Sequence, residues 1–259
     1  MVFENNFDPV LLSIGPLEIR WYGALFATGI LLAYYFLKWI FKREKFSATD
    51  LDSVIIYLII GLIVGARLGN VLFYNPEYFL KHPLEIVMIW KGGLASHGAA
   101  IGVLCAYLIW IKVHKVGFSK YPDFLVLAFP IASAFVRFGN FFNSEIVGIP
   151  TQNSQYGVVF KKLGEDFPRH PSQLYEAVQN ILIFALMFFI YIKWNKKLPK
   201  LGLFFIYVFV YFLSRFVLEF WKVKDGLPQD YPLSMGQILS IVPIVISLGY
   251  LAYARWKNK

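Results

Sequence analysis

Long runs of apolar residues constrain the fold of this chain more than any other feature of the sequence. The runs "WYGALFATGILLAYYFLKWIF" (21–41), "VIIYLIIGLIVGA" (54–66) and "LGLFFIYVFVYFL" (201–213) reach or approach the roughly 20 apolar residues that cross a bilayer as a helix. Hydrophobic residues make up 58% of the chain, and charged residues make up only 16%, well below the proportion in soluble domains. The sequence therefore predicts an integral membrane protein.

The apolar residues follow one another instead of alternating with polar ones, which favours helices over a transmembrane barrel. We expect an all-α protein with about seven transmembrane helices in a single polytopic domain, residues 1–259. The expected spans cover roughly residues 18–41, 51–74, 96–113, 122–142, 173–193, 201–221 and 234–254. Residues 1–16 contain Glu4 and Asp8 but no Lys or Arg, so we expect no cleaved signal peptide and a retained first helix.

The basic residues are distributed unequally between the two ends of these spans. The loops and ends on one side carry 14 Lys and Arg residues, and those on the other side carry 7. The positive-inside rule then predicts an N-terminus outside the cell and a C-terminus in the cytoplasm. The net charge of +9 is explained by topology and by anionic headgroups, so we expect no nucleic-acid partner.

Two outer connections are long enough to carry structure of their own. Residues 143–172 are too short for an independent domain, and we expect a small cap between spans 4 and 5. Residues 75–96 contain "YFL" and "LEIVMIW", which could lie along the membrane interface as short amphipathic pieces. Within the second span, Gly61, Gly65 and Gly69 have a spacing that lets a neighbouring helix approach closely. The single cysteine, Cys105, excludes an intramolecular disulfide and is interpreted as a core residue.

Four arginines remain after the loop charges are assigned, and all four fall within or at the ends of the expected spans: Arg20, Arg67, Arg137 and Arg215. An arginine at bilayer depth costs about 2.5–3.5 kcal/mol even on a lenient scale, so the fold must compensate for it. Arg20 is close enough to a span end for its side chain to reach the headgroups. Arg137 and Asn140 share a helix face, Asn143 extends that polar stripe, and Glu145 lies just beyond it.

Other polar residues in or beside the spans have both a structural and a functional interpretation. Arg215 and Glu219 have the spacing of an intrahelical ion pair, which is either a self-neutralised bridge or a guanidinium with donors left for a phosphate. His97, between glycines in "KGGLASHGAAIG", is either a packed, hydrogen-bonded group or a proton carrier. "RHPSQLYE" (169–176) resembles a helix start with Pro171 in its first turn, and this alone would explain Glu176.

The pattern excludes several other kinds of site. The four histidines are scattered, no glycine-rich nucleotide loop is present, and no serine lies in a nucleophile elbow, so we expect no metal and no cofactor. The polar set is rich in Arg, Asn, Glu, His and Tyr and faces outward. A phospholipid headgroup is the anionic ligand that suits such a set.

Six short motifs, in order along the chain, resemble the bacterial prolipoprotein diacylglyceryl transferases. They are "RWYG" (20–23), "GARLG" (65–69), "GGLASHG" (92–98), "RFGNFFNSE" (137–145), "RHPSQLYE" (169–176) and "SRFVLEF" (214–220). The resemblance implies a seven-span inner-membrane enzyme with an outer-facing site. Such an enzyme moves the diacylglyceryl group of phosphatidylglycerol onto the lipobox cysteine of a prolipoprotein, forms a thioether and releases glycerol phosphate. The implied partners are therefore phosphatidylglycerol, prolipoprotein signal peptides and the bilayer, and we expect a monomer.

The resemblance also implies site residues at the positions that match the family motifs. The expected catalytic residues are Arg137, Arg215, His97 and Tyr22. The expected phosphatidylglycerol-binding residues are Arg137, Asn140, Asn143, Glu145, Arg67, Arg215, Glu219, Glu176 and Asp123. The chain departs from the family pattern at Ser144 and Ala99, where glycine is common, and both changes affect local turn geometry more than activity.

These residues suggest a mechanism in which the substrate supplies the thiol nucleophile. Arg137 and Arg215 would clamp the phosphate and stabilise the leaving group, because preorganised donors in a dry site stabilise developing charge best. Asn140 and Asn143 would add neutral donors, and the phenylalanines of the motif would form an acyl-compatible wall. Glu145 and Glu219 would orient the arginines, and His97 or Tyr22 would assist removal of the thiol proton.

Two other classes of protein remain open at this point. A secondary transporter or channel for an anionic solute would also use arginines within the membrane, but it should show inverted repeats or paired broken helices, which the sequence lacks. A structural scaffold would explain the glycines and the aromatic residues at span ends, but not the arginines.

Overall fold

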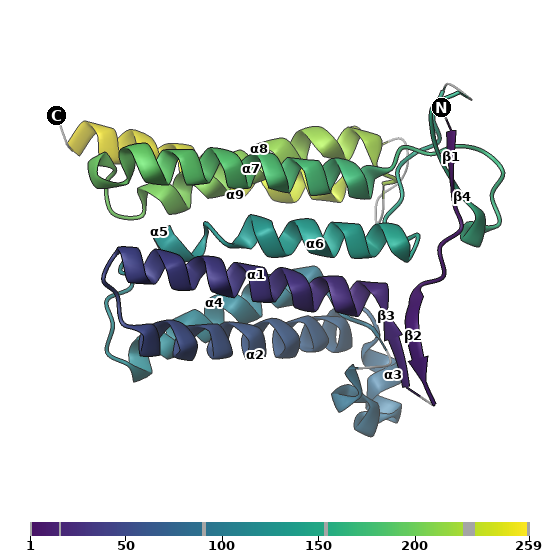
Figure 1. Cartoon of the computed structure of the whole chain (residues 1–259), viewed down its shortest axis with the longest axis horizontal. Coiled ribbons are helices and arrows are strands. Elements are labelled where there is room, and N and C mark those ends of the chain that lie inside the picture. Colours follow the sequence, from purple (N-terminus) through teal and green to yellow (C-terminus); the bar gives the residue numbers. More distant parts are fainter. Residues whose placement is uncertain (1, 16, 90–91, 153–154, 225–230, 258–259) are drawn as a thin grey trace. The chain divides into compact units, whose positions relative to one another are not determined.

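The computed structural model describes residues 2–15, 17–89, 92–152, 155–224 and 231–257 (Figure 1). Within them, 6 helices are long and apolar enough to cross a membrane: Trp21–Arg43, Ala48–Phe73, Pro122–Phe142, Ser172–Lys197, Gly202–Trp221 and Met235–Lys257. A shorter apolar helix, His97–Val113, corresponds to the remaining expected span. The prediction of an all-α, multi-pass membrane protein is confirmed, and the expected spans match these helices within a few residues.

The chain divides into two compact units, which are described separately here. One unit comprises Met1–Leu37 together with Pro122–Lys259, and the other comprises Lys38–Tyr121. This division does not test the expectation of a single membrane domain, which stays a prediction.

In the Lys38–Tyr121 unit, helix α2 (Ala48–Phe73) packs against helix α4 (Ser96–Val113) through glycines on both helices. A Cβ atom on Gly65 would lie 2.7 Å from the Cα of Gly102, and one on Gly69 would lie 2.8 Å from the Cα of Gly98. The predicted packing role of the glycine repeat is confirmed, because no side chain fits between the two backbones. The helices α3 (Pro76–Lys81) and η1 (Pro83–Val87) follow the end of α2.

The other unit holds α5 (Pro122–Leu125), α6 (Phe129–Phe142), α7 (Ser172–Trp194), α8 (Gly202–Leu218) and α9 (Met235–Lys257). Helix α1 spans Trp21–Arg43, and its part up to Leu37 belongs to the same unit. The short 3₁₀ helices η3 (Lys161–Leu163), η4 (Asn195–Lys197) and η5 (Glu219–Trp221) follow β4, α7 and α8. Helix α7 packs against both α6 and α8, and α8 packs against α9. Helix α1 approaches α6 at Gly29, where a Cβ atom would lie 2.7 Å from the Cβ of Phe135.

The same unit contains two small sheets that the sequence did not predict. Strand β1 (Val2–Asn5) pairs in parallel with β4 (Gly157–Phe160), and β2 (Val10–Ile14) pairs antiparallel with β3 (Leu17–Arg20). Val2 lies opposite Gly157, so the parallel pair joins segments that are far apart in the sequence. Strands of 4 or 5 residues leave little periodicity to detect, and the pairing partner of β1 is not local.

The described part of the segment 143–172, called the cap below, is folded, and its outward-facing position stays a prediction. Its backbone closes on itself through bonds such as Gly148 N to His170 O (2.9 Å) and Val158 N to Arg169 O (2.9 Å). Ile149 N also donates to Trp221 O (3.0 Å), so the cap is bonded to the segment that follows α8. Arg169 holds Glu165 through Nε and Nη2, each 2.5 Å from a carboxylate oxygen, and this hydrogen bonding lowers the pKa of Glu165.

The Glu165–Arg169 pair should make cap stability depend on acid pH. Because the pKa of Glu165 is lowered on folding, its contribution is complete above the ordinary value of 4.5 and is lost as pH falls through the folded-state pKa. The thermal midpoints of wild type and Glu165→Gln should therefore differ at pH 6.5, by at most about 1 kcal/mol in stability, and converge near pH 3. A difference that persists unchanged at pH 3 would contradict this origin.

The glycine contact between α2 and α4 predicts a second effect on stability. Gly102→Leu should lower the stability of the protein in detergent by about 1–3 kcal/mol or more, because the side chain must enter the α2 backbone. Gly249→Leu is the matched control, since no heavy atom lies within 4 Å of a Cβ placed there. Equal thermal midpoints for the two variants would show that the contact is not tight.

Candidate functional site

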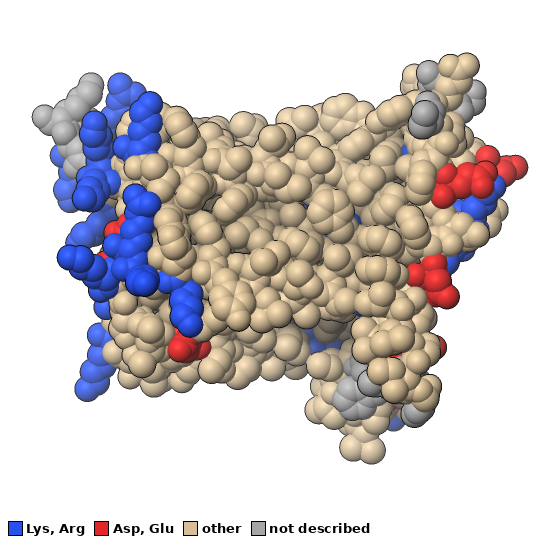
Figure 2. All heavy atoms as spheres, in the orientation of Figure 1, with Lys and Arg blue, Asp and Glu red and all other residues tan. Residues whose placement is uncertain are grey.

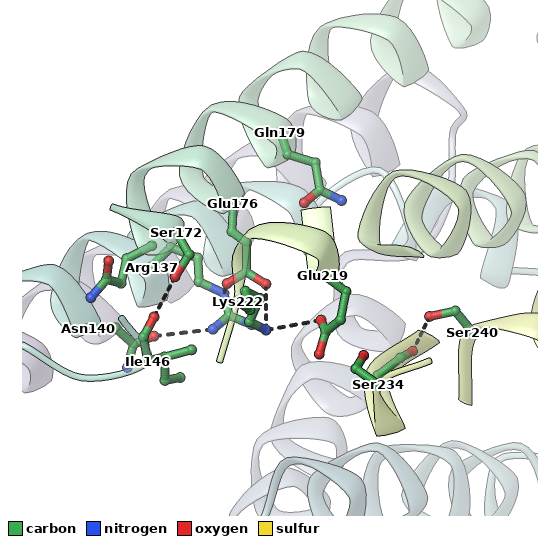
Figure 3. A network of polar contacts seen from close by, with 12 residues as sticks. Arg137, Asn140, Ile146, Ser172, Glu176, Gln179, Glu219, Lys222, Ser234 and Ser240 are labelled. Carbon is green, nitrogen blue, oxygen red and sulfur yellow. Dashed lines mark hydrogen bonds and ion pairs between the residues drawn. The ribbon is translucent and has the colours of Figure 1, made fainter. Parts of the chain in front are cut away.

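The candidate site is built at the C-terminal end of α6 and the N-terminal end of α7. Asn143 caps α6, and the chain then turns through Ser144 and Ile146, which have positive φ angles of 57° and 55°. The first residues of α7 hold this turn: Ser172 Oγ donates to Ile146 O (2.6 Å), and Gln173 Nε2 donates to Glu145 O (2.5 Å). The end of α6 is thus fixed against α7 by hydrogen bonds (Figure 3).

The predicted polar stripe on α6 is confirmed. Arg137 Nη1 donates to Asn140 Oδ1 at 3.4 Å, a long bond. Asn140 Nδ2 donates to Oε2 of Glu145, and Asn143 Nδ2 donates to Oε1 of the same carboxylate, both at 3.2 Å. Glu145 therefore fixes the two amides. No ion pair links it to Arg137 among the residues that the structure describes, although it was expected to orient an arginine.

Glu176 is the carboxylate that holds Arg137. Its side chain is only 5% exposed, and its Oε2 lies 3.0 Å from Arg137 Nε. Its Oε1 lies 3.3 Å from Lys222 Nζ (Figure 3). The expectation that a helix start alone would explain Glu176 is therefore corrected. This residue lies in the second turn of α7, and its partners lie on two other segments that the sequence spacing could not bring together.

Lys222 is a site residue that the sequence analysis missed, because it was counted among the loop cations. Its side chain is 11% exposed, and Nζ lies 3.3 Å from an oxygen of Glu176 and 3.3 Å from an oxygen of Glu219. The one available signal was its position three residues after Glu219, since an i,i+3 spacing can support an ion pair.

The expected ion pair between Arg215 and Glu219 is corrected by the same geometry. Helix α8 ends at Leu218, and Glu219 begins the 3₁₀ helix η5, so its carboxylate points toward Lys222 and toward Gly236 in the first turn of α9. In the described part of the chain, no carboxylate forms an ion pair with Arg215. The charges of Glu219 and Glu176 are near enough to act on its guanidinium, together with Tyr211.

Tyr22 belongs to the same group of residues. It lies in the first turn of α1 and packs on Gly139 of α6, where a Cβ atom would lie 2.9 Å from Tyr22 Cδ2. Glu145 and Arg137 are near enough for their charges to act on the tyrosine hydroxyl. Gly139 thus permits the close approach that brings an α1 side chain to the α6 stripe.

Asp123 has a structural role that the sequence did not predict. Its Oδ2 accepts a bond from Leu201 N (2.7 Å), and its Oδ1 accepts one from Phe204 N (2.8 Å). These bonds satisfy free N–H groups at the start of α8, the helix end opposite to the one that carries Arg215. Asp123 therefore caps the start of α8, and its expected binding of substrate stays a prediction.

Arg67 lies in the Lys38–Tyr121 unit, and it too is a structural residue. Its five N–H donors all bond to backbone oxygens. Nε donates to Ile86 O, Nη1 to Gly92 O and Gly93 O, and Nη2 to Glu85 O and Met88 O. All of its donors are engaged in this arrangement, and the expected binding of Arg67 to substrate stays a prediction.

The two remaining expected positions are exposed. His97, in the first turn of α4, lines a groove of about 280 Å³ together with Phe73, Tyr74 and Ile101 of its own unit. Its role in proton transfer therefore stays a prediction. Arg20 pairs with Glu18 at 3.3 Å, and its side chain is 60% exposed, which fits an arginine at a span end.

The membrane helices and the buried charges define a class: a multi-pass membrane protein with a cluster of buried ion pairs at one end of its helices. Residues 9–253 match the sequence profile of the family described as prolipoprotein diacylglyceryl transferase, and the chain belongs to that family. A phosphatidylglycerol–prolipoprotein diacylglyceryl transferase of Tolumonas auensis is 42% identical over 244 residues, 93% of each chain. A protein of the same name from Chloroherpeton thalassium is 38% identical and aligns over 94% of this chain and 91% of its own length. Another from Ehrlichia ruminantium is 36% identical and aligns over 98% of this chain and 99% of its own length.

The donor geometry of Arg67 predicts a large loss of local order when the guanidinium is removed. Arg67→Lys keeps the charge but leaves several carbonyls without donors, so we expect a loss of about 2–3 kcal/mol. Amide hydrogen exchange in residues 85–88 should accelerate accordingly. Arg20→Lys, at an exposed position, is the control and should change neither exchange nor thermal midpoint. Unchanged exchange in Arg67→Lys would contradict the assignment.

Proposed function

We propose that this protein transfers the diacylglyceryl group of phosphatidylglycerol to the lipobox cysteine of prolipoproteins, the first step of lipoprotein maturation. Family membership supports the reaction class, and the names of the relatives supply the two substrates. The observation that carries the proposal is Arg215, an arginine on a membrane helix that forms no ion pair in the described part of the chain. A partly buried guanidinium of this kind calls for an anionic ligand.

Arg137 and Arg215 would bind the phosphate of the lipid together. Glu176 contacts Arg137 through Nε, and Asn140 accepts one weak bond from Nη1, so donors of the guanidinium fork remain for phosphate oxygens. The amide groups of Asn140 and Asn143 are held by Glu145 and line the same end of α6. Phe142, which is partly exposed, supplies apolar surface beside them on which an acyl chain could pack, whereas Phe141 is buried against Val158 and Phe160.

In the proposed reaction the thiol sulfur of the prolipoprotein attacks the glyceryl carbon that bears the phosphate ester. The sulfur–carbon bond forms as the carbon–oxygen bond breaks, and the bonding electron pair leaves with the oxygen of glycerol phosphate. Negative charge therefore grows on the phosphate, where the two guanidinium groups stabilise it. The thiol proton must leave because the thiolate is the reactive nucleophile.

Tyr22 and His97 are the two candidates for assisting that proton transfer. Tyr22 is supported by its position against Gly139, beside Glu145 and Arg137. His97 is supported by the family motif and by its exposed position at the start of α4. Histidine has the more suitable intrinsic pKa near neutral pH.

The site would face the outer leaflet of the cytoplasmic membrane. In the unit that carries it, basic residues lie at the opposite helix ends, including Lys193 on α7 and Arg255 and Lys257 on α9. Figure 2 shows Lys and Arg gathered over these ends and largely absent from the middle of the helices. By the positive-inside rule the basic ends lie in the cytoplasm.

The phosphate clamp can be tested with Arg215→Lys, which keeps the charge but removes the guanidinium fork. We expect thioether transfer to fall by about 10²–10³-fold, the effect of losing a preorganised donor to a developing anion. The assay uses purified protein, phosphatidylglycerol labelled in its glyceryl and acyl parts, and a lipobox peptide with cysteine or serine. Label should appear on the cysteine peptide alone.

Arg255→Lys, at an exposed helix end, is the matched control and should retain wild-type turnover. Near-normal transfer by folded Arg215→Lys would refute the clamp. Absence of transfer by the wild type, together with uptake of a labelled anion by proteoliposomes, would instead indicate a transporter.

A further inference from the structure

Lys222 lies between two buried carboxylates that also flank the arginines. Its Nζ is 3.3 Å from Glu176 and 3.3 Å from Glu219, whose side chains are 5% and 9% exposed. Glu176 reaches Arg137 through its second oxygen, and the charges of both carboxylates act on Arg215. Figure 3 shows the connected row of Arg137, Glu176, Lys222 and Glu219. A single ammonium group therefore bridges Glu176 and Glu219, and Arg137 supplies a second positive charge to Glu176.

Without Lys222, Glu219 would still lie within electrostatic range of the Arg215 guanidinium. The two residues are four apart, at the end of α8, a spacing that suits an ion pair. A buried carboxylate left without a cation is costly, so a nearby guanidinium would move to compensate it. A guanidinium bound to Glu219 has fewer donors to offer a phosphate.

We propose that Lys222 is a positioning residue that holds Glu219 and Glu176 and thereby keeps the Arg215 guanidinium available for the lipid phosphate. This inference rests on the proposed function, because it concerns the same phosphate clamp, which Arg137 and Arg215 form. Lys222 acts through the carboxylates and makes no contact of its own with the reacting atoms.

The position of Lys222 is fixed by two neighbouring elements. Its backbone forms a bridge with Gly148 of the cap, where a Cβ atom would collide with Trp221 O and with His170. Glu219 is fixed on the other side by Gly236, because a Cβ at that position would occupy the space of its carboxylate. The carboxylate also lies at the N-terminal end of α9, where the helix dipole favours a negative charge. The ion pair is thus held from both sides.

The test is a double-mutant cycle between Lys222 and Glu219, read as KM for phosphatidylglycerol and as kcat. Lys222→Met should raise KM about tenfold with a much smaller change in kcat, which corresponds to about 1.4 kcal/mol of lost lipid binding. In the Glu219→Gln background the same substitution should raise KM less than about twofold, because no carboxylate remains to capture Arg215. Lys222→Arg, which keeps the charge, should restore most of the affinity.

Lys224→Met is the matched control for loss of a positive charge, two residues further along, and it should leave KM unchanged. Lys224 Nζ donates to Tyr231 O, outside the row of ion pairs. An equal rise in KM in both Glu219 backgrounds would overturn the proposal, and so would a fall in kcat alone.

Two further outcomes are distinguishable. If Lys222→Met does not accumulate, the pair Glu219→Gln and Glu219→Gln/Lys222→Met still decides, because a tenfold difference in KM between them would refute the coupling. A wild-type protein that transfers no label from phosphatidylglycerol would refute the proposed function, whereas normal wild-type transfer with an uncoupled cycle would refute only the role of Lys222.

Discussion

The structure of the site depends on one constraint, which is that a charge placed among membrane helices must be compensated by another group. Arg137 on α6 is compensated by Glu176 on α7, Glu176 also binds Lys222, and Lys222 binds Glu219 after α8. Each ion pair except the last crosses from one element to another. The charges therefore fix the relative positions of these segments as well as their own, since any shift would separate a pair in a low-dielectric surrounding.

The same constraint is met in another way at Arg67, and the contrast separates a structural arginine from a ligand-binding one. Arg67 is compensated by neutral carbonyls, which use all five of its donors and tie residues 85–93 to α2. Arg137 uses few of its donors, and Arg215 has no carboxylate partner in the described part of the chain. Arg67 is buried, whereas Arg137 and Arg215 are only partly buried. The number of unused donors distinguishes them as well.

Much of the fold could be predicted from sequence, because its determinants are local. A run of apolar residues fixes a span, glycines four apart fix the contact of α2 with α4, and a three-residue spacing places Arg137 beside Asn140. The unpredicted features are non-local. Strand β1 pairs with a segment about 155 residues away, and Glu176 meets Arg137 only because α7 packs on α6. The capping bonds of Asp123 could not be predicted either, because a motif position carries no information about which N–H groups will be nearby.

The balance of charges in the site has a consequence for the proposed reaction. Arg137, Arg215 and Lys222 equal in number the carboxylates Glu145, Glu176 and Glu219, although Arg215 and Glu145 form no ion pair in the described part of the chain. A phosphodiester brings one negative charge, and breakage of the carbon–oxygen bond adds more to the departing phosphate. With no surplus cation, stabilisation must come from the orientation of donors, which favours the charge distribution of the transition state over that of the substrate. In the proposed reaction, a site whose charges sum to zero would also retain an anionic product less strongly than a cationic one, which would favour release of glycerol phosphate.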